Sequence, residues 1–151
     1  MGARTSGREA ALQMLYAFDV QRERSAGRRG RPSVEQVALD YWEETPGEPE
    51  GREYAAELVR GAVVDLGEID ALIRAASRHW RVERMARVDR NVLRLGTYEL
   101  RARPDVPRAV IIDEAVELAK RYGAEGSGVF VNGVLDRIAE DLGRRDEPAT
   151  S

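Results

Sequence analysis

Two helical patterns separated by a short glycine-rich segment constrain the fold more than any other feature of this chain. Apolar side chains recur at helical spacing on both sides of residues 123–128. They are Ile111, Ala115, Leu118, Ala119 and Tyr122 before the segment, and Val131, Val134, Leu135, Ile138 and Leu142 after it. Gly123 is placed to end the first helix in a left-handed C-cap, and Ser127 to cap the start of the second. The pattern predicts a helical hairpin.

The N-terminal part of the chain shows the same period. Ser6 and Glu9 form a predicted capping box, from which a helix runs to about Arg24. Ser33 opens a short second helix that ends near Glu44.

The middle of the chain is also predicted to be helical. A long helix covers about 52–77, with a possible bend at Gly67, and a short helical turn follows at 80–85. The next helix spans 88–101, with Asp89 expected to be exposed at its start, and it is ended by Pro104 and Pro107. No segment shows sustained period-two alternation, and there is no repeat of 20–50 residues. We therefore predict an all-α fold of about seven helices.

The length of 151 residues suits a single domain spanning residues 1–151. We expect a mobile N-terminus over about 1–5, loops over about 25–32 and 45–51, and a polar tail over about 144–151. The absence of cysteine excludes disulfides, thiol nucleophiles and thiolate metal sites. No apolar run approaches the ~18 residues of a membrane span, and no signal-peptide core is seen, so a cytoplasmic location is predicted.

Charge is distributed unevenly along the chain. Residues 1–31 contain seven arginines and three acids, which gives this segment a charge of +4. Because the net charge of the whole chain is −3, the remaining residues together carry −7. Such asymmetry is typical of a protein with one end facing a polyanion. The alternative is compositional, because 23 of the 24 basic residues in the whole chain are arginine.

Candidate catalytic residues are few. His79 is the only histidine, and it lacks the further His or Cys ligands of a common zinc site. The acids Asp113, Glu114, Glu117, Glu140 and Asp141 are better explained by helix electrostatics than by acid–base chemistry. The glycine-rich segment 123–128 follows a helix rather than a strand and lacks the P-loop lysine, so it is interpreted as a helix connection.

Arg4 and Arg8 stand in the first turns of the first helix, where cations oppose the helix dipole. Tyr16 lies two turns beyond Arg8 on the same helix. A row of arginine and aromatic side chains suits single-stranded RNA, because guanidinium groups meet phosphates and bases stack on rings. The alternative for Tyr16 is a tyrosine at the edge of the core.

Phe130 lies roughly 100° from the centre of the apolar stripe of the last helix. Its ring therefore flanks the core, either packing on the neighbouring helix or offering a face to a partner.

Three blocks of sequence occur in a fixed order between residues 8 and 138. They are REAALQMLY at 8–16; VDRNVLRL at 88–95 with Tyr98-Glu99-Leu100 and Asp105-Val106-Pro107; and VELAK at 116–120 with Tyr122-Gly123, Ser127 and FVNGVLD at 130–136. They resemble the corresponding blocks of the bacterial antitermination factor NusB family, whose fold consists of two small helical bundles.

The resemblance implies a non-catalytic, cofactor-free and metal-free protein that binds boxA-type single-stranded RNA of ribosomal RNA transcripts. It would do so with NusE, a small-subunit ribosomal protein, and help RNA polymerase read through terminators. The positions matching RNA contacts are Arg4, Arg8, Gln13, Tyr16, Lys120, Ser127 and Phe130, and those matching the NusE interface are Glu83, Arg84, Asp89 and Arg90. The Thr5-Ser6-Gly7 interruption leaves fewer basic residues than in some relatives, which implies weaker RNA affinity.

Two alternatives belong to other functional classes. The same helical domain precedes some rRNA cytosine methyltransferases, although a chain that ends in a polar tail at Ser151 leaves no room for a methyl-donor domain. The chain could instead be a self-associating adaptor, possible as a homodimer, that does not bind RNA.

Overall fold

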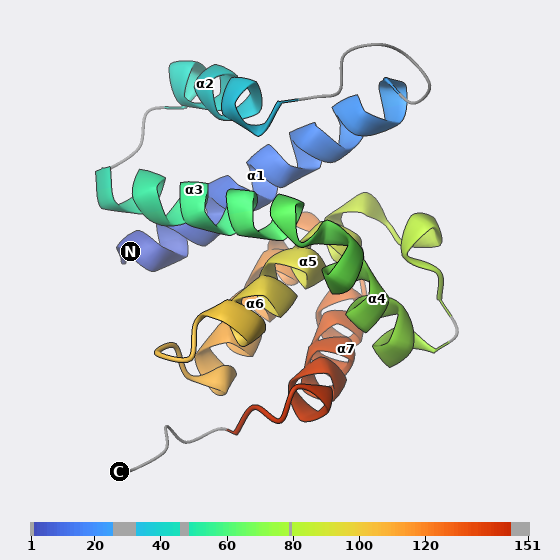
Figure 1. Cartoon of the computed structure of the whole chain (residues 1–151). Helices are drawn as coiled ribbons and strands as arrows, with labels where there is room; N and C mark the ends of the chain where they lie inside the picture. Colours follow the sequence, from blue (N-terminus) through green and yellow to red (C-terminus); the bar gives the residue numbers. More distant parts are fainter. Residues whose placement is uncertain (1, 26–32, 46–48, 79, 146–151) are drawn as a thin grey trace. The chain divides into compact units, whose positions relative to one another are not determined.

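The described part of the chain folds into helices only, as predicted (Figure 1). The computed structural model describes residues 2–25, 33–45, 49–78 and 80–145, and within these ranges there are seven α-helices, one 3-10 helix and no strand. The structure divides into two compact units, Met1–Val64 and Asp65–Ser151, matching the expected two helical bundles. None of the helices in the described ranges is both long enough and apolar enough to cross a membrane.

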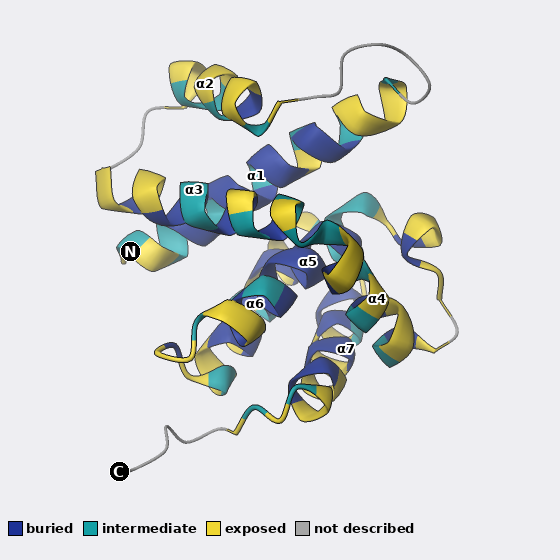
Figure 2. Ribbon diagram, in the orientation of Figure 1, coloured by how far each residue is buried: buried dark blue, intermediate teal, exposed yellow. Residues whose placement is uncertain are grey.

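The first unit contains α1 (Ala3–Arg24), α2 (Val34–Glu44) and α3 (Pro49–Val64). Its core lies mainly between α1 and α3, which bury apolar side chains such as Leu15 and Leu58. Helix α2 buries only Val37 and is otherwise half-buried or exposed, as Figure 2 shows.

The second unit is built around α5 (Arg87–Ala102), which contacts α4 (Leu66–Ser77), α6 (Arg108–Tyr122) and α7 (Ser127–Asp141). The short 3-10 helix η1 (Val82–Arg84) precedes α5. Buried side chains lie almost all round α5 rather than along one stripe, because other helices cover it on several sides (Figure 2).

The start of α1 differs from the prediction. The helix begins at Ala3 with Gly2 as N-cap, so Ser6 lies inside the helix and the predicted capping box is wrong. The Ser6 amide donates to the Gly2 carbonyl oxygen at 3.1 Å, which closes one more helical turn than the sequence suggested. Residues 3–5, which belong to the N-terminus expected to be mobile over about 1–5, are therefore helical.

The predicted helix over 52–77 is in fact two helices. The break falls at Asp65, not at Gly67, where two β-branched residues, Val63 and Val64, lower the helix propensity. Helix α3 also begins earlier than expected, at Pro49, because a proline in the first turn needs no N–H donor. The loop predicted over 45–51 was therefore too long.

The predicted cap of α2 is confirmed. The Ser33 hydroxyl accepts a hydrogen bond from the Gln36 amide at 3.3 Å. The backbone amide of Glu35 and the Ser33 hydroxyl together lower the pKa of the Glu35 carboxyl.

The α6–α7 hairpin is confirmed and Gly123 is the C-cap of α6, but the left-handed conformation predicted for Gly123 and the cap predicted at Ser127 are wrong. Gly123 is extended (φ −94°, ψ −169°), and the left-handed residue is Gly126 (φ 87°), which caps α7. Ser127 is the first residue of α7, and its hydroxyl oxygen accepts from the Ala124 amide at 3.0 Å. The serine thus stabilises the turn from within the helix. The positive φ falls on Gly126 because glycine adopts it at lower cost than a residue with a side chain.

A buried ion pair joins α4 to α5. The Arg94 guanidinium donates through Nε and Nη2 to the two carboxylate oxygens of Asp70, both at 2.9 Å, and through Nη1 to Asn91 Oδ1 at 3.0 Å. The Asn91 amide in turn donates to the Arg87 carbonyl oxygen. Each of the three guanidinium nitrogens therefore donates to an oxygen, which is the arrangement that a buried cation requires.

The end of the described chain is held in place by Arg144. Its guanidinium donates to the carbonyl oxygens of Leu100 at 2.8 Å and Val106 at 2.6 Å, and its own carbonyl accepts from Arg108. Arg144, the first residue of the polar tail expected over about 144–151, is therefore anchored. The rest of that tail, residues 146–151, and most of the loop predicted over 25–32 lie outside the described residues.

The buried ion pair yields a stability prediction. Asp70→Asn leaves the Arg94 charge without its counter-ion, so the free energy of unfolding should fall by about 3 kcal/mol in urea denaturation. The matched control is Glu68→Gln, also on α4, whose carboxylate pairs with Arg101 at 2.8 Å but is 72% exposed. In Glu68→Gln, the free energy of unfolding should fall by less than about 1 kcal/mol. Equal falls in the two variants would contradict the prediction.

Candidate nucleic-acid interface

In the first unit, two arginines of α1 lie against one aromatic ring of α3. The guanidinium carbon atoms of Arg4 and Arg8 are 5.5 and 5.6 Å from the centroid of the Tyr54 ring. Both distances are within the range of a cation–π interaction. Tyr54 is buried, and Arg8 is only 3% exposed, whereas Arg4 is exposed. Of the two arginines, Arg4 is thus the one available to a phosphate, and Arg8 is mainly part of the packing.

Close packing explains the glycine in the Thr5-Ser6-Gly7 interruption of the basic run. A Cβ atom at Gly7 would lie 2.9 Å from the Gly51 carbonyl oxygen and 3.1 Å from Tyr54 Cβ. Helix α1 therefore approaches α3 too closely for any side chain at this position. The glycine brings Arg4 and Arg8 to the Tyr54 ring and cannot itself be replaced by a basic residue.

The other two candidates on α1 lie further along the helix. Tyr16 is 39% exposed and Gln13 is half-buried. The structure places Tyr16 at the edge of the core with part of its ring open, so both interpretations of this residue stay compatible with its position.

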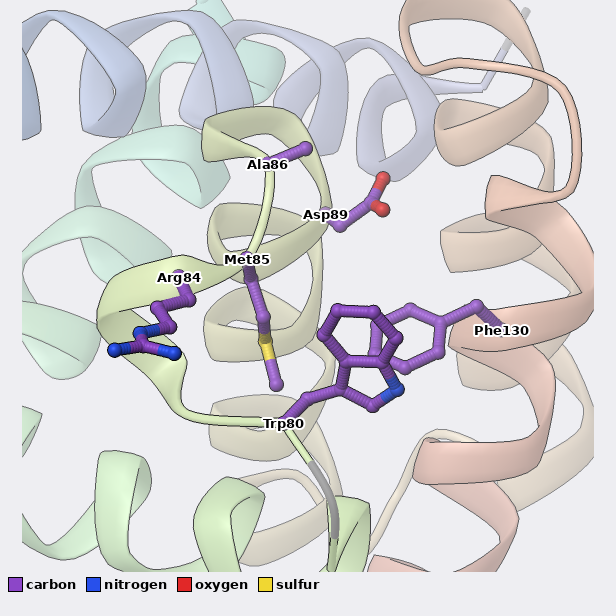
Figure 3. Close-up of a pocket in the computed structure, with 6 residues that line it drawn as sticks. All are labelled: Trp80, Arg84, Met85, Ala86, Asp89 and Phe130. Atoms are coloured by element: carbon purple, nitrogen blue, oxygen red, sulfur yellow. The ribbon is translucent and has the colours of Figure 1, made fainter.

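In the second unit, Phe130 forms one wall of a pocket of about 140 Å³ (Figure 3). The other lining residues come from the segment around η1 and from the start of α5: Trp80, Arg84, Met85, Ala86 and Asp89. Phe130 is half-buried, which confirms that its ring flanks the core. The pocket brings together a residue predicted to bind RNA and two predicted to bind a protein partner.

The two charged residues that line this pocket, Asp89 and Arg84, differ in how far they are exposed. Asp89 is partly buried, not exposed as expected, and its Oδ1 atom is buried without a hydrogen-bond partner. Arg84 is exposed, and Figure 3 shows its guanidinium pointing away from Asp89. Asp89 therefore contributes to the lining of the pocket, while its Oδ1 atom is buried without a partner.

The remaining candidates for partner binding differ in accessibility. Glu83 is exposed on η1, whereas Arg90 is 6% exposed and donates through Nη1 to the Glu83 carbonyl oxygen at 3.4 Å. Arg90 thus holds η1 against α5, and Glu83 and Arg84 form the accessible part of this group.

Lys120 and Ser127 lie where α6 meets α7. The Lys120 side chain is 63% exposed, and its Cγ atom lies 3.0 Å from the position that a Cβ of Gly128 would occupy. Ser127 is 4% exposed and its hydroxyl is engaged in the turn. Lys120 is therefore accessible to a phosphate, and Ser127 shapes the turn that carries Phe130.

The described part of the chain contains no group of three or more His, Asp or Glu side chains placed to hold a metal ion. His79 lies outside the described residues.

Sequence reasoning missed three residues of these two sites. Tyr54 was recognised only as a member of an apolar stripe, because nothing in the sequence pairs it with arginines more than 40 positions away. Trp80 and Met85 were assigned to a helical turn, although an exposed tryptophan next to such a turn is itself a sign of a binding surface.

Comparison with known proteins places this helical chain in the class of transcription antitermination proteins. A sequence model described as the NusB family matches residues 5–140. The transcription antitermination protein NusB of Sorangium cellulosum (strain So ce56) is 64% identical over 146 residues, covering 97% of this chain and 98% of the relative. That of Myxococcus xanthus (strain DK1622) is 46% identical, covering 95% and 99%. The chain belongs to the NusB family.

Solved structures agree with this assignment. NusB of T. maritima superposes with a TM-score of 0.80 at 41% identity, covering 91% of both chains. A chain from a crystal structure of the antitermination factors NusB and NusE in complex with dsRNA gives a TM-score of 0.76 at 32% identity, covering 93% of this chain and 98% of that one.

The close approach at Gly7 predicts opposite effects for two glycine-to-alanine changes. Gly7→Ala should lower the free energy of unfolding by about 1–3 kcal/mol, because the new Cβ meets backbone atoms of α3. Gly133→Ala, inside α7 with nothing within 4 Å of its Cβ position, should raise it by about 0.5–1 kcal/mol. Thermal or urea denaturation measures both, and a stabilised Gly7→Ala protein would refute the close packing.

Proposed function

We propose that this protein binds boxA-type single-stranded RNA of ribosomal RNA transcripts together with NusE, and so helps RNA polymerase read through terminators. The observation that carries the proposal is the half-buried Phe130 in the first turn of α7, which lines a pocket, together with the exposed Lys120, whose stem lies against the same turn at Gly128. The relative solved with NusE and dsRNA supports it. The protein would act in the cytoplasm, where bacterial transcripts are made.

In this proposal, phosphates and bases are bound by different residues. Arg4 and Lys120 are exposed cations that can neutralise phosphates. Phe130 and the open part of the Tyr16 ring offer stacking surfaces for unpaired bases. Arg8, Gln13 and Ser127 contribute mainly by holding these residues in place, since their side chains are buried or half-buried.

NusE would dock on the exposed part of η1 and the start of α5. Glu83 and Arg84 present both signs of charge there, which suits the polar rim of an interface. Arg90 would act indirectly by fixing η1.

The central experiment is a titration with a boxA-like RNA, with and without NusE, by fluorescence anisotropy. We expect binding that tightens when NusE is present. Sedimentation of the free protein, run in parallel, reports whether it forms a homodimer. A protein that self-associates and shows no affinity for RNA in either titration would be an adaptor instead.

Replacing Arg4 with alanine should change RNA binding, whereas replacing Arg8 should mainly change stability. Arg4→Ala should lower the slope of log affinity against log salt by roughly 0.7, the value for one lost phosphate contact on a single strand. Arg8→Ala should mainly lower the melting temperature, because it removes a buried side chain from the α1–α3 packing. An unchanged slope for Arg4→Ala would place the phosphate contacts elsewhere.

Phe130→Ala distinguishes a stacking surface from a core residue. We expect RNA affinity to fall by ~1–3 kcal/mol, or roughly five- to 150-fold, while stability falls by only about 1 kcal/mol, since the ring is only half-buried. Val131→Ala, at a fully buried position next to it, should show the reverse pattern. A stability loss of ~3–5 kcal/mol with unchanged RNA affinity per folded molecule would assign Phe130 to the core.

A further inference from the structure

We propose that Lys120 is a modification site, whose side-chain amine is acylated by an activated acyl donor and which then binds RNA more weakly. The donor is an acyl phosphate or an acyl thioester. The proposal rests on the proposed function and deepens it, since it makes RNA binding at the α6–α7 turn responsive to acylation.

The amine of Lys120 has no equal among the side chains of this protein. Lys120 is the only lysine among 24 basic residues, and the other 23 are arginines. Arginine stays protonated at neutral pH, whereas a lysine amine is a nucleophile toward carbonyl carbon and a common target of acetylation. The sequence also contains no cysteine, whose thiolate would compete for the acyl group. A donor that reacts with amines therefore meets one reactive side chain.

The amine is accessible, and the stem that carries it is held in place. The side chain of Lys120 is 63% exposed. A Cβ atom at Gly128 would lie 3.0 Å from Lys120 Cγ and 3.4 Å from Cε, so the aliphatic stem runs along the first turn of α7. Among the described residues, the amine faces the Glu117 carboxylate at 3.8 Å, which is longer than a hydrogen bond. The packed stem thus fixes where the amine lies and leaves it open to a reagent.

The reaction is an acyl transfer to nitrogen. The Lys120 ammonium releases one proton to water, and the neutral Nζ atom attacks the carbonyl carbon of the donor. The N–C bond forms while the bond from that carbon to the phosphate oxygen or thioester sulfur breaks. The phosphate or thiol leaves with the electron pair and with a second proton from the nitrogen. Arg121, the next residue and also exposed, adds a cation that attracts the anionic donor.

Acylation would reverse the effect of this position on a nearby phosphate. The amide product is neutral, so Lys120 no longer attracts a phosphate. Glu117, one helical turn earlier and 72% exposed, keeps its negative charge. The pair therefore changes from neutral to negative beside the turn that carries Phe130, which disfavours an RNA strand there.

The test treats the natural protein with acetyl phosphate or, in a second sample, with acetyl-CoA, and maps acetylated peptides by mass spectrometry. We expect acetylation of Lys120. Fluorescence anisotropy with the boxA-like RNA should then show affinity lowered by roughly two- to fivefold, the size of one exposed ion pair. The slope of log affinity against log salt should fall by roughly 0.7, for one lost phosphate contact. RNA added before the donor should slow the acetylation.

The matched controls remove the amine and then place it elsewhere. Lys120→Arg keeps a cation but has no amine, so treatment should leave its RNA affinity at the value measured before treatment. Adding Arg74→Lys to this variant returns one lysine at an exposed position on α4, outside the pocket. The double variant should be acetylated, again with no change in affinity on treatment. The amine at the start of the chain is common to all three proteins and cancels in the comparison.

Two results would overturn the proposal. One is that neither donor acetylates Lys120 under conditions that acetylate the lysine introduced at position 74. The other is that Lys120 is acetylated and RNA affinity does not change. If the untreated natural protein does not bind RNA at all, the proposed function is rejected and the regulatory role with it. Peptide mapping needs no RNA, so it still decides in that case whether Lys120 is the acylated residue.

Discussion

The buried ion pair between Arg94 and Asp70 fixes the helix on which the second unit is built. Helix α5 contacts α4, α6 and α7, and its guanidinium can be buried only while the Asp70 carboxylate meets it in a two-point geometry. The same helix anchors η1 through Arg90 and receives the Arg144 guanidinium at its C-terminal carbonyl groups. The walls of the aromatic pocket come from the segment around η1, from the start of α5 and from α7, so their spacing depends on the position of α5.

The first unit is organised by a close approach between backbones. Because Gly7 has no side chain, α1 comes near enough to α3 for the Tyr54 ring to meet the guanidinium groups of Arg4 and Arg8. The ring offsets part of the cost of placing two cations in the first turns of a helix, where the dipole opposes them. Arginine is suited to this task, since its planar and weakly hydrated guanidinium can be buried against a ring while another edge stays available to hydrogen-bond acceptors.

The sequence predicted the features that depend on periodicity and failed at those that depend on distance in space. The helical class, the Ser33 cap and the offset of Phe130 from the core all follow from spacing along one helix, and all are confirmed. The error at Gly123 arose because two glycines were available, and only the turn geometry decides that Gly126 takes the positive φ. The sequence did not indicate that the helix is interrupted at Asp65, because the apolar stripe continues from α3 into α4.

The candidate sites were predicted as separate sets of residues, and their grouping required the fold. No pattern along the chain could show that Phe130 shares a pocket with Asp89, because the two residues come from different helices. Asp89 shows the difference. Its place in the first turn of α5 explains the acid through the helix dipole, whereas only the fold shows that it lines a pocket with Phe130 and that its Oδ1 atom is buried without a hydrogen-bond partner. Burying an acceptor without a partner is unfavourable, so the start of α5 carries an energetic cost that no pattern along the chain could indicate.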